Sequence, residues 1–215
     1  EVQQKAAVLY RKQPRFQLIT TGKISQKTLL FEKQHLERLQ KASRYFAFPF
    51  DAEDLRQKIE EECQACDLHQ DYRLRISLSK SGAIEIERQV LTPLSSSFCQ
   101  AKLCLQEADL QRAFTYFKTT HRPHLTMGEQ EIIYHTADGK LLETSIGNLV
   151  LKMDGKLYTP PSQLGLLPGI YRQHLLESGQ VEEKVLTIED LAQAEAIYGC
   201  NAVRGLYELS VKKEH

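Results

Sequence analysis

No stretch of the 215-residue sequence approaches the roughly 20 consecutive apolar residues that a membrane-spanning helix needs. Charge of one sign is not in excess either, because 28 Lys and Arg residues balance 28 Asp and Glu residues. This balance argues against a protein that works mainly by wrapping nucleic acid or by lying on an anionic membrane. We therefore expect no nucleic-acid partner and no membrane partner. Internal repeats and low-complexity tracts are also missing, which argues against a repeat protein.

Cysteines are few and irregularly spaced. An odd number of five argues against a disulfide scaffold and favours a reducing compartment, so we expect a cytoplasmic protein. The Cys63-Gln64-Ala65-Cys66 motif is compatible with a redox function or with half of a zinc site, but no second C-x-x-C and no His-x(3–5)-His follows it. Leu55, Ile59, Cys63 and Cys66 have helical spacing, which favours a buried helix stripe and no metal site.

What the sequence does contain is typical of a globular protein with a sizeable core. Hydrophobic residues make up 41% and charged residues 26%, which excludes a disordered or fibrous chain. The polar, Ser-rich stretch 92–97 is the best linker candidate, so we expect one domain over residues 1–94 and another over residues 95–215. Because the sequence opens at Glu1 without an initiator Met, we expect a processed or excised part of a longer chain.

Strand-like and helix-like segments alternate along the first part of the chain, and strands dominate the second. In the first part we expect strands at 16–24 and 28–31, helices at 32–46 and 51–66 with Asp51 as the N-cap, and a hairpin formed by 72–78 and 83–90. In the second part we expect strands at 99–105, 131–134, 147–153, 156–159 and 201–211, and helices at about 169–178 and from Thr187.

One segment, Leu166–Arg172, combines a Pro-Gly turn with the start of a helix. The N–H groups of Ile170 and Tyr171 would be unpaired donors at the positive end of the helix dipole, an arrangement that suits a phosphate group. The simpler interpretation, in which Pro-Gly only starts a helix, stays open at this point.

Three single residues are further candidates. Lys118 lies between an aromatic pair and two hydroxyl residues, and burial there would lower its pKa and make its neutral amine a nucleophile. Glu143, in a Gly- and Ser-rich strand edge, could approach a protonated ring nitrogen of a ligand. Arg38 lies in an amphipathic helix. Each also has a simpler interpretation, as a solvated lysine, a solvent-facing acid and an exposed helical arginine.

Five elements, taken together and in order, resemble the class IV aminotransferase family, the fold-type IV pyridoxal phosphate enzymes. They are His35–Leu39 (family pattern H-L-x-R-L), Lys118–Arg122 (K-T-T-H-R here, K-T-T-N-R in the family), Glu143–Leu149 (family pattern E-x-x-x-x-N-L), Thr159–Pro161 with Gly165–Arg172 (family patterns T-P-P and G-x-L-P-G-I-x-R), and Asn201–Gly205 (N-A-V-R-G here, N-S-V-R-G in the family). The resemblance covers about nine-tenths of the chain, from Phe16 to the end.

The resemblance implies an α+β protein with a small α/β N-terminal domain and a larger barrel-like C-terminal domain, with the cofactor pyridoxal phosphate between them. Lys118 would bind the cofactor covalently, Glu143 would pair with its ring nitrogen, and Arg38 would bind its phosphate. The other cofactor contacts implied are Leu167, Ile170, Tyr171, Asn201 and Ala202. Arg204 and His121 are candidates for recognition of a substrate carboxylate, and Thr20 or Thr21 for a hydrogen bond near the lysine. Family members are usually homodimers.

Within the family, the K-T-T-x-R and N-x-V-R-G variants are more similar to aminodeoxychorismate lyases than to branched-chain or D-amino-acid aminotransferases. This implies a small-molecule amine substrate, release of pyruvate to give 4-aminobenzoate, and a place in folate biosynthesis, with a chorismate-using synthase as a fused or separate partner. The Leu18–Lys23 strand departs from the family's E-T-x-R pattern. That departure motivates the alternative of a non-catalytic partner domain of such a synthase.

Overall fold

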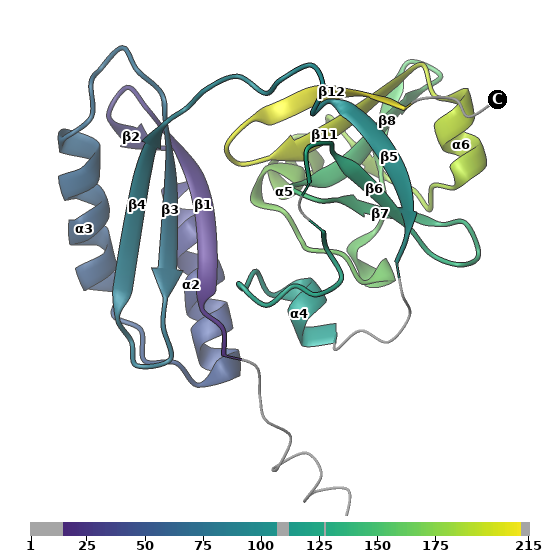
Figure 1. Cartoon of the computed structure of the whole chain (residues 1–215). Coiled ribbons are helices and arrows are strands. Elements are labelled where there is room, and N and C mark those ends of the chain that lie inside the picture. Colours follow the sequence, from purple (N-terminus) through teal and green to yellow (C-terminus); the bar gives the residue numbers. More distant parts are fainter. Residues whose placement is uncertain (1–14, 107–111, 127, 212–215) are drawn as a thin grey trace, which may run out of the picture.

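The structure, a computed structural model, describes residues 15–106, 112–126 and 128–211. Two sheets follow one another along the chain and form two units that lie side by side (Figure 1). The N-terminal unit is built from residues 18–90 and the C-terminal unit from residues 100–211. The expected α+β fold is confirmed. The expected boundary at residue 94 falls in the segment that joins the two sheets, and the division into separate domains stays a prediction.

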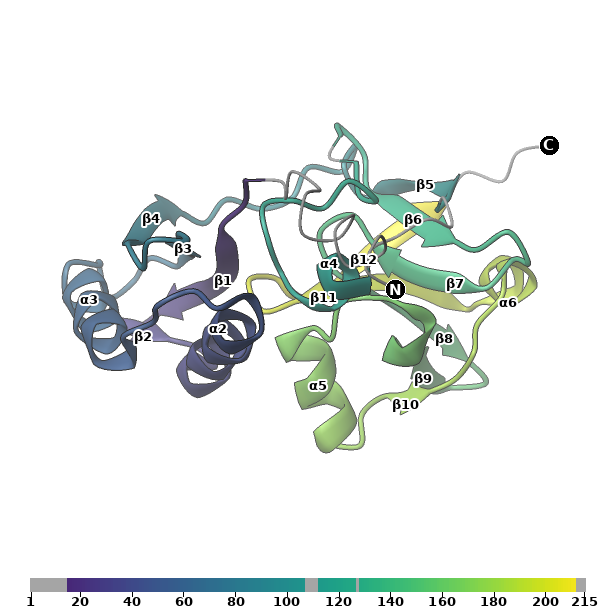
Figure 2. The ribbon, with the colours of Figure 1, turned by 90° about the horizontal axis from the view of Figure 1, so that it is seen from below.

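The N-terminal unit is a four-stranded antiparallel sheet with two helices on one face (Figures 1 and 2). The strand order is β2-β1-β3-β4, and each neighbouring pair runs antiparallel. Its elements are β1 (Leu18–Ser25), β2 (Thr28–Leu29), α2 (Glu32–Phe46), α3 (Ala52–Gln64), β3 (Tyr72–Leu78) and β4 (Ile84–Val90). These elements confirm the expected helices and hairpin to within a few residues.

Apolar side chains at helical and strand spacing explain why this unit folds as it does. Leu36 and Leu39 of α2 pack with Leu74 and Ile76 of β3 in one core, and each buried side chain of this size contributes about 1.5–3 kcal/mol. Asp51 begins α3 by accepting the N–H groups of two residues in its first turn, as expected. Leu55, Ile59, Cys63 and Cys66 are all buried in the same core, which confirms the buried helix stripe.

The C-terminal unit is a closed barrel of six strands. The pairing order is β8-β11-β12-β5-β6-β7, and a further pairing of β7 with β8 closes the ring, while β9 and β10 extend from β8. Its strands are β5 (Gln100–Leu105), β6 (Ile132–His135), β7 (Leu141–Thr144), β8 (Asn148–Met153), β9 (Lys156–Thr159), β10 (Glu182–Glu183), β11 (Ala196–Asn201) and β12 (Gly205–Val211). Its helices are α4 (Arg112–Tyr116), the 3-10 helix η1 (Ser162–Leu164), α5 (Ile170–Glu177) and α6 (Ile188–Gln193).

Two parts of the C-terminal unit differ from the expectation. The single strand expected at 201–211 is the second half of a hairpin: β11 begins at Ala196, and the chain turns before Gly205, which has a φ of 69°. The turn was missed because apolar residues continue on both sides of it. Its only glycine, Gly205, stands at its end, next to Arg204, and so did not mark a break in the strand pattern. The short elements α4, β7, η1 and β10 were not among the expected helices and strands, since each is too short to show clear periodicity. The capping box at Thr187 and the end of α5 before Gly179 are confirmed.

The segment that carries Lys118 holds the two units together. Lys118 accepts a backbone hydrogen bond from Ile19 of β1 at 2.9 Å, and the N–H of Thr120 donates to Gln17 at 2.9 Å. An aromatic cluster lies beside this pairing, in which the ring of Phe16 is 5.1 Å from that of Phe114 and Phe46 is 5.4 Å from Phe117. Side chains from both units therefore fix the backbone on either side of Lys118.

The described residues include neither a helix that could cross a membrane nor a cluster of metal ligands. No helix among them combines the length and apolar character that crossing a membrane requires. Within the same residues, no group of three or more His, Cys, Asp or Glu side chains is placed to hold a metal ion.

Candidate active site

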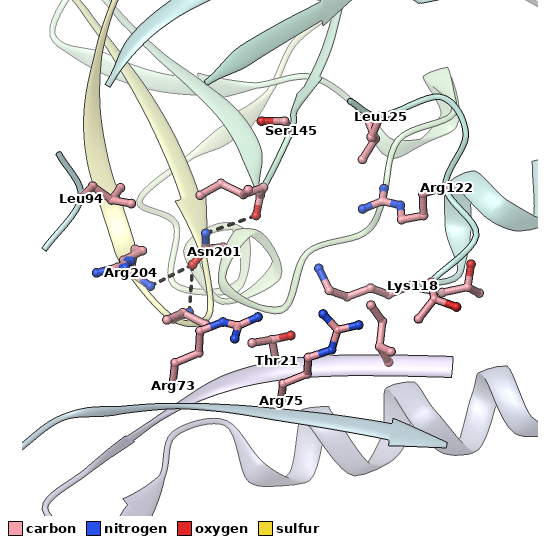
Figure 3. Close-up of a pocket in the computed structure, with 15 residues that line it drawn as sticks. Thr21, Arg73, Arg75, Leu94, Lys118, Arg122, Leu125, Ser145, Asn201 and Arg204 are labelled. Carbon is pink, nitrogen blue, oxygen red and sulfur yellow. Dashed lines mark hydrogen bonds between the residues drawn. The ribbon is translucent and has the colours of Figure 1, made fainter. Parts of the chain in front are cut away.

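A cavity of about 460 Å³ lies between the two units, and side chains from both line it (Figure 3). The N-terminal sheet supplies its floor, and the Lys118 segment and the barrel supply its walls. The lining residues are Ile19, Thr21, Arg73, Arg75, Leu94, Lys118, Thr119, Thr120, Arg122, Leu125, Ser145, Ile146, Asn201, Val203 and Arg204. The cavity thus brings together residues more than 100 positions apart in the sequence.

Lys118 extends into this cavity from the segment paired with β1 (Figure 3). Burial, together with the positive charges of Arg122, Arg38 and Arg73, lowers the pKa of Lys118 to about 7, and Glu143 opposes the decrease. A large fraction of the amine is therefore neutral near pH 7, whereas an ordinary lysine is almost entirely protonated there. The neutral amine is the form that attacks an aldehyde carbon.

Glu143 of β7 is only 2% exposed and lies behind the Arg122 side chain. Arg122 Nη2 donates to Oε1 of Glu143 at 3.1 Å and to Oε2 at 3.4 Å. Burial raises the pKa of Glu143, while the Arg122 charge and the Leu167 N–H oppose the increase. His124 Nε2 lies 4.0 Å from the same carboxylate, but burial lowers the pKa of His124 to about 4, so this imidazole is neutral near pH 7.

A guanidinium group and the first N–H groups of a helix meet where α2 contacts the start of α5. Arg38 Nη2 donates to the carbonyl oxygen of Pro168 at 2.8 Å, and Asn148 Nδ2 donates to that of Leu167 at 2.8 Å. These two bonds fix the loop that leads into α5, whose N-cap, Gly169, supplies no side-chain cap. The first N–H groups of the helix are thus left for another acceptor, as expected for Ile170 and Tyr171.

The turn between β11 and β12 holds Asn201 and Arg204 at the end of the cavity that lies away from Arg122 (Figure 3). Asn201 Oδ1 accepts the N–H groups of Val203 at 3.0 Å and Arg204 at 2.8 Å, and its Nδ2 donates to Ile146. The Arg204 guanidinium donates to the carbonyl oxygen of Thr92, in the segment that joins the units. Both residues line the cavity (Figure 3).

Two of the substrate-site candidates from the sequence, Thr20 and His121, do not line this cavity. Thr20 is fully buried on the helix side of β1, where its hydroxyl shares a 2.6 Å hydrogen bond with His35 Nδ1. Alternation along β1 turns Thr21 to the cavity instead, so Thr21 replaces Thr20 as the candidate. His121 packs edge-on against Phe114, with ring centroids 4.9 Å apart, and is not among the lining residues.

The remaining cofactor candidates surround the loop and the turn without lining this cavity. Leu167 is buried and contributes backbone groups, its N–H to Glu143 and its carbonyl to Asn148. Ile170 and the Arg38 side chain line a second hollow between α2 and α5. Tyr171 packs against Phe31 of the N-terminal unit, and Ala202 lies in the turn beside Asn201.

The cavity residues that sequence reasoning missed include three arginines and a serine: Arg73, Arg75, Arg122 and Ser145. Arg122 was part of the K-T-T-H-R segment but was given no role. It lies only four positions after Lys118, which was a signal that it could share the lysine's site. Arg73 and Arg75 alternate with Leu74 and Ile76, so their shared face was predictable, but not what that face meets.

The residues present fit pyridoxal phosphate. An aldehyde requires an amine that is neutral near pH 7, and Lys118 is one. A phosphate requires cations and N–H donors, which Arg38 and the start of α5 supply. A ring nitrogen requires a carboxylate, and Glu143 is a buried acid that interacts electrostatically with Lys118. Its carboxylate accepts from Arg122 and lies just outside the lining of the cavity.

Three curated relatives are similar to this chain. An uncharacterised protein of Haemophilus influenzae is 38% identical over 69 residues, which are 32% of this chain and 36% of the relative. A Thermotoga maritima protein named "Probable branched-chain-amino-acid aminotransferase" is 28% identical over 109 residues, 46% of this chain and 40% of the relative. These two matches therefore span well under half of the relatives' own length. A Schizosaccharomyces pombe protein named "Putative aminodeoxychorismate lyase" is 22% identical over 187 residues, 79% of each chain.

Solved structures with the same fold carry both kinds of name. A Mesorhizobium loti protein described as a "Putative amino-acid aminotransferase" superposes with a TM-score of 0.79 at 27% identity, over 92% of this chain and 100% of that one. A Haemophilus somnus protein described as a "putative 4-amino-4-deoxychorismate lyase" gives a TM-score of 0.71 at 25% identity, over 90% of this chain and 100% of that one. A hypothetical aminotransferase of Mycobacterium tuberculosis in a pyridoxal-phosphate-bound form gives 0.75 at 18% identity, over 91% and 81%, and shows the fold alone.

The family comparison covers nearly the whole described chain. Residues 17–210 match the family model described as amino-transferase class IV, so the match includes both units and every cavity residue. Members of that family are pyridoxal-phosphate-dependent enzymes. The chain therefore belongs to the class IV amino-transferase family and is an enzyme.

Proposed function

We propose that this enzyme is a pyridoxal-phosphate-dependent lyase that converts 4-amino-4-deoxychorismate to 4-aminobenzoate and pyruvate, a step of folate biosynthesis. The observation that carries the proposal is the charge of the cavity, in which Lys118 lies among the guanidinium groups of four arginines. The substrate has one amine and two carboxylates, and a cavity of this kind favours it over an amino acid with an apolar side chain. The names of the Schizosaccharomyces pombe and Haemophilus somnus proteins support the same reaction.

Four groups would hold the cofactor. Lys118 would bind its aldehyde carbon covalently, and Glu143 would keep its ring nitrogen protonated. Arg38 and the N–H groups of Ile170 and Tyr171 would bind its phosphate. When bound, pyridoxal phosphate supplies an electron sink that acidifies the C–H bond next to the substrate amine.

The chain's own residues then move one proton and orient the leaving group. With a pKa of about 7, the Lys118 amine, once released by the substrate amine, can accept the proton from the carbon that bears nitrogen. The neighbouring C–O bond breaks, its electron pair leaves with the enolpyruvate oxygen, and the ring becomes aromatic. The enolpyruvate takes up a proton and becomes pyruvate. The reaction is a net elimination and needs no oxidant.

An aminotransferase is the second candidate. It is favoured by the similarity to the Mesorhizobium loti protein, which has the highest TM-score of the three structures compared here, and by the Thermotoga maritima relative. In that reaction Lys118 would return the proton to the cofactor carbon, and a 2-oxo acid would then be aminated.

A product assay separates the two candidates. Protein loaded with pyridoxal phosphate is mixed with 4-amino-4-deoxychorismate, and 4-aminobenzoate is followed by fluorescence while pyruvate is followed with lactate dehydrogenase. We expect both products in equal amounts, and a loss of at least about 1,000-fold in kcat for Lys118→Arg, which keeps the charge but not the reactive amine. Amination of a branched-chain or D-2-oxo acid without pyruvate release would establish the aminotransferase instead.

The proposal also extends to partners. One such partner is a second copy of the chain. Leu103 and Leu105 of β5 are 38% and 52% exposed, although β5 is paired with a strand on each side, and exposed leucines of this kind favour a contact with another protein surface. Light scattering on the purified protein tests this, with a single-chain mass as the contrary result. A chorismate-using synthase, fused or separate, is the class of enzyme that supplies the substrate.

A further inference from the structure

The floor of the cavity carries two arginines that have no role so far. Arg73 and Arg75 are two residues apart on β3 and therefore share one face of the N-terminal sheet. Leu74 and Ile76 point to the opposite face, into the core under the helices. Thr21, on the neighbouring strand β1, is the register partner of Arg75 and also belongs to this floor, below Lys118 (Figure 3).

The other cavity arginines are already engaged with the protein. Arg122 binds Glu143, and Arg204 donates to the carbonyl oxygen of Thr92. By contrast, within residues 15–106, 112–126 and 128–211 we find no hydrogen bond or ion pair formed by the guanidinium of Arg73 or Arg75. Arg75 Nε is also buried without a partner among those residues. An unpaired buried donor is costly, so an acceptor is missing from this floor.

The charges around the two arginines point to an anion. Five cationic side chains line the cavity, and no lining residue is acidic. The pKa of Arg73 is lowered by burial and by repulsion from Arg75 and Arg204, and only partly restored by Glu87 of β4. Bound anions would relieve this repulsion.

The spacing of the two guanidinium groups suits two separate carboxylates. Alternate residues on a strand are about 7 Å apart, and a guanidinium binds a carboxylate through two parallel N–H bonds. Arg75 lies on the Lys118 side and Arg73 on the Asn201 and Arg204 side (Figure 3). A ligand attached at Lys118 can therefore place one acid group near each.

Building on the proposed lyase function, we propose that Arg73 and Arg75 form a two-carboxylate subsite that selects dicarboxylate substrates over amino acids with one carboxylate. The subsite acts in binding and orientation, and the two arginines take no part in proton transfer. Its loss weakens the binding of dicarboxylates far more than the binding of monocarboxylates.

The test measures binding without turnover. Chorismate has two carboxylates and a hydroxyl in place of the amine, so it cannot react with the cofactor aldehyde as an amine does, and benzoate has one carboxylate. Calorimetry with cofactor-loaded protein compares both probes for wild type, Arg73→Gln, Arg75→Gln and the double variant. The control is Arg56→Gln, which removes a positive charge from the exposed side of α3.

We expect each single variant to raise the Kd for chorismate at least about tenfold, the double variant to raise it further, and benzoate to change less than about threefold. Arg75→Lys should recover part of the loss, and the cofactor absorbance should show that every variant is still loaded. A double variant that stays loaded and binds chorismate like wild type overturns the inference, as does an equal loss for both probes.

The test also separates this inference from the function on which it rests. If wild type binds chorismate through the two arginines but forms no 4-aminobenzoate, the lyase proposal fails and the subsite stands. If wild type forms 4-aminobenzoate and the double variant keeps its Kd and KM, the subsite fails and the lyase proposal stands.

Discussion

The amine of Lys118 is placed among positive charges, since Arg122, Arg38 and Arg73 all lower its pKa in addition to burial. Protonated Lys118 is therefore less favourable in the folded protein than in the unfolded chain, where its pKa is ordinary, near 10.5. The same arrangement that keeps the amine reactive destabilises the cofactor-free protein. Reactivity at this residue and fold stability are thus opposed.

The stability of Lys118→Met tests this opposition as a function of pH. Because the folded pKa is lower than the unfolded pKa, the unfolded state binds more protons between about pH 7 and pH 10.5, and wild-type stability rises across that window. We expect Lys118→Met to be more stable than cofactor-free wild type at pH 6, and the difference to shrink as the pH rises above 7. Urea unfolding at several pH values measures it.

Lys80→Met, which changes an exposed lysine in the β3–β4 turn, is the matched control and should show no such trend. A stability difference between Lys118→Met and wild type that stays constant from pH 6 to pH 10 would contradict the account of the lysine.

Single residues were predictable from sequence only where a motif fixed them. Lys118 and Asn201 stood in motifs, and the structure places both at the cavity. The choice between Thr20 and Thr21 depended on which face of β1 meets the helices, and His35 on α2 decided it by bonding Thr20. His35 is 15 positions from Thr20, so the residues next to Thr20 in the sequence do not indicate this contact.

At the scale of elements, the start of α5 depends on its close approach to β8. A Cβ atom at Gly169 would clash with Asn148 Oδ1 of β8. Gly169 has an ordinary φ of −68°, so the glycine is needed for space and not for conformation. The approach lets Asn148 hold the Leu167 carbonyl and so sets where the N–H groups of α5 point.

Gly169→Ala is therefore expected to move this loop and weaken phosphate binding. The Kd for pyridoxal phosphate should rise at least about tenfold, because the contact costs on the order of 1–3 kcal/mol unless the loop shifts. Absorbance titration of the cofactor measures it, with Gly128→Ala as the control, since the nearest atom to a Cβ there is 3.8 Å away. Equal cofactor affinity in the two variants would show that the loop does not form the phosphate site.

The elements themselves were largely predictable, since caps and periodicity are local. Asp51 and Thr187 marked helix starts, and alternation marked β3 and β4. The polar face of β3 was visible in the sequence as Arg73 and Arg75, but its meaning was not, because the barrel that covers it begins at β5. Burial of a sheet face by a unit that comes later in the chain is a tertiary contact, which local sequence patterns do not predict.

For the whole molecule, the junction of the two units is the functional feature. In the sequence Lys118 lies between β5 and β6 of the barrel, but its backbone pairs with β1 of the N-terminal unit. The ring of Phe31 also packs against Tyr171 and His174, which brings α2 to α5 (Figure 2). Both contacts lie at the junction of the two units, so a cofactor held by Lys118 and by the start of α5 would bridge them.

The most direct test of this account is reduction of the cofactor-loaded protein with borohydride, followed by mass mapping of the peptides. We expect a single added pyridoxyl phosphate group, on Lys118, and no label on Lys23 or Lys41, which lie elsewhere in the N-terminal unit. No label on Lys118 in protein that has been incubated with excess cofactor, or a label spread over surface lysines, would contradict it.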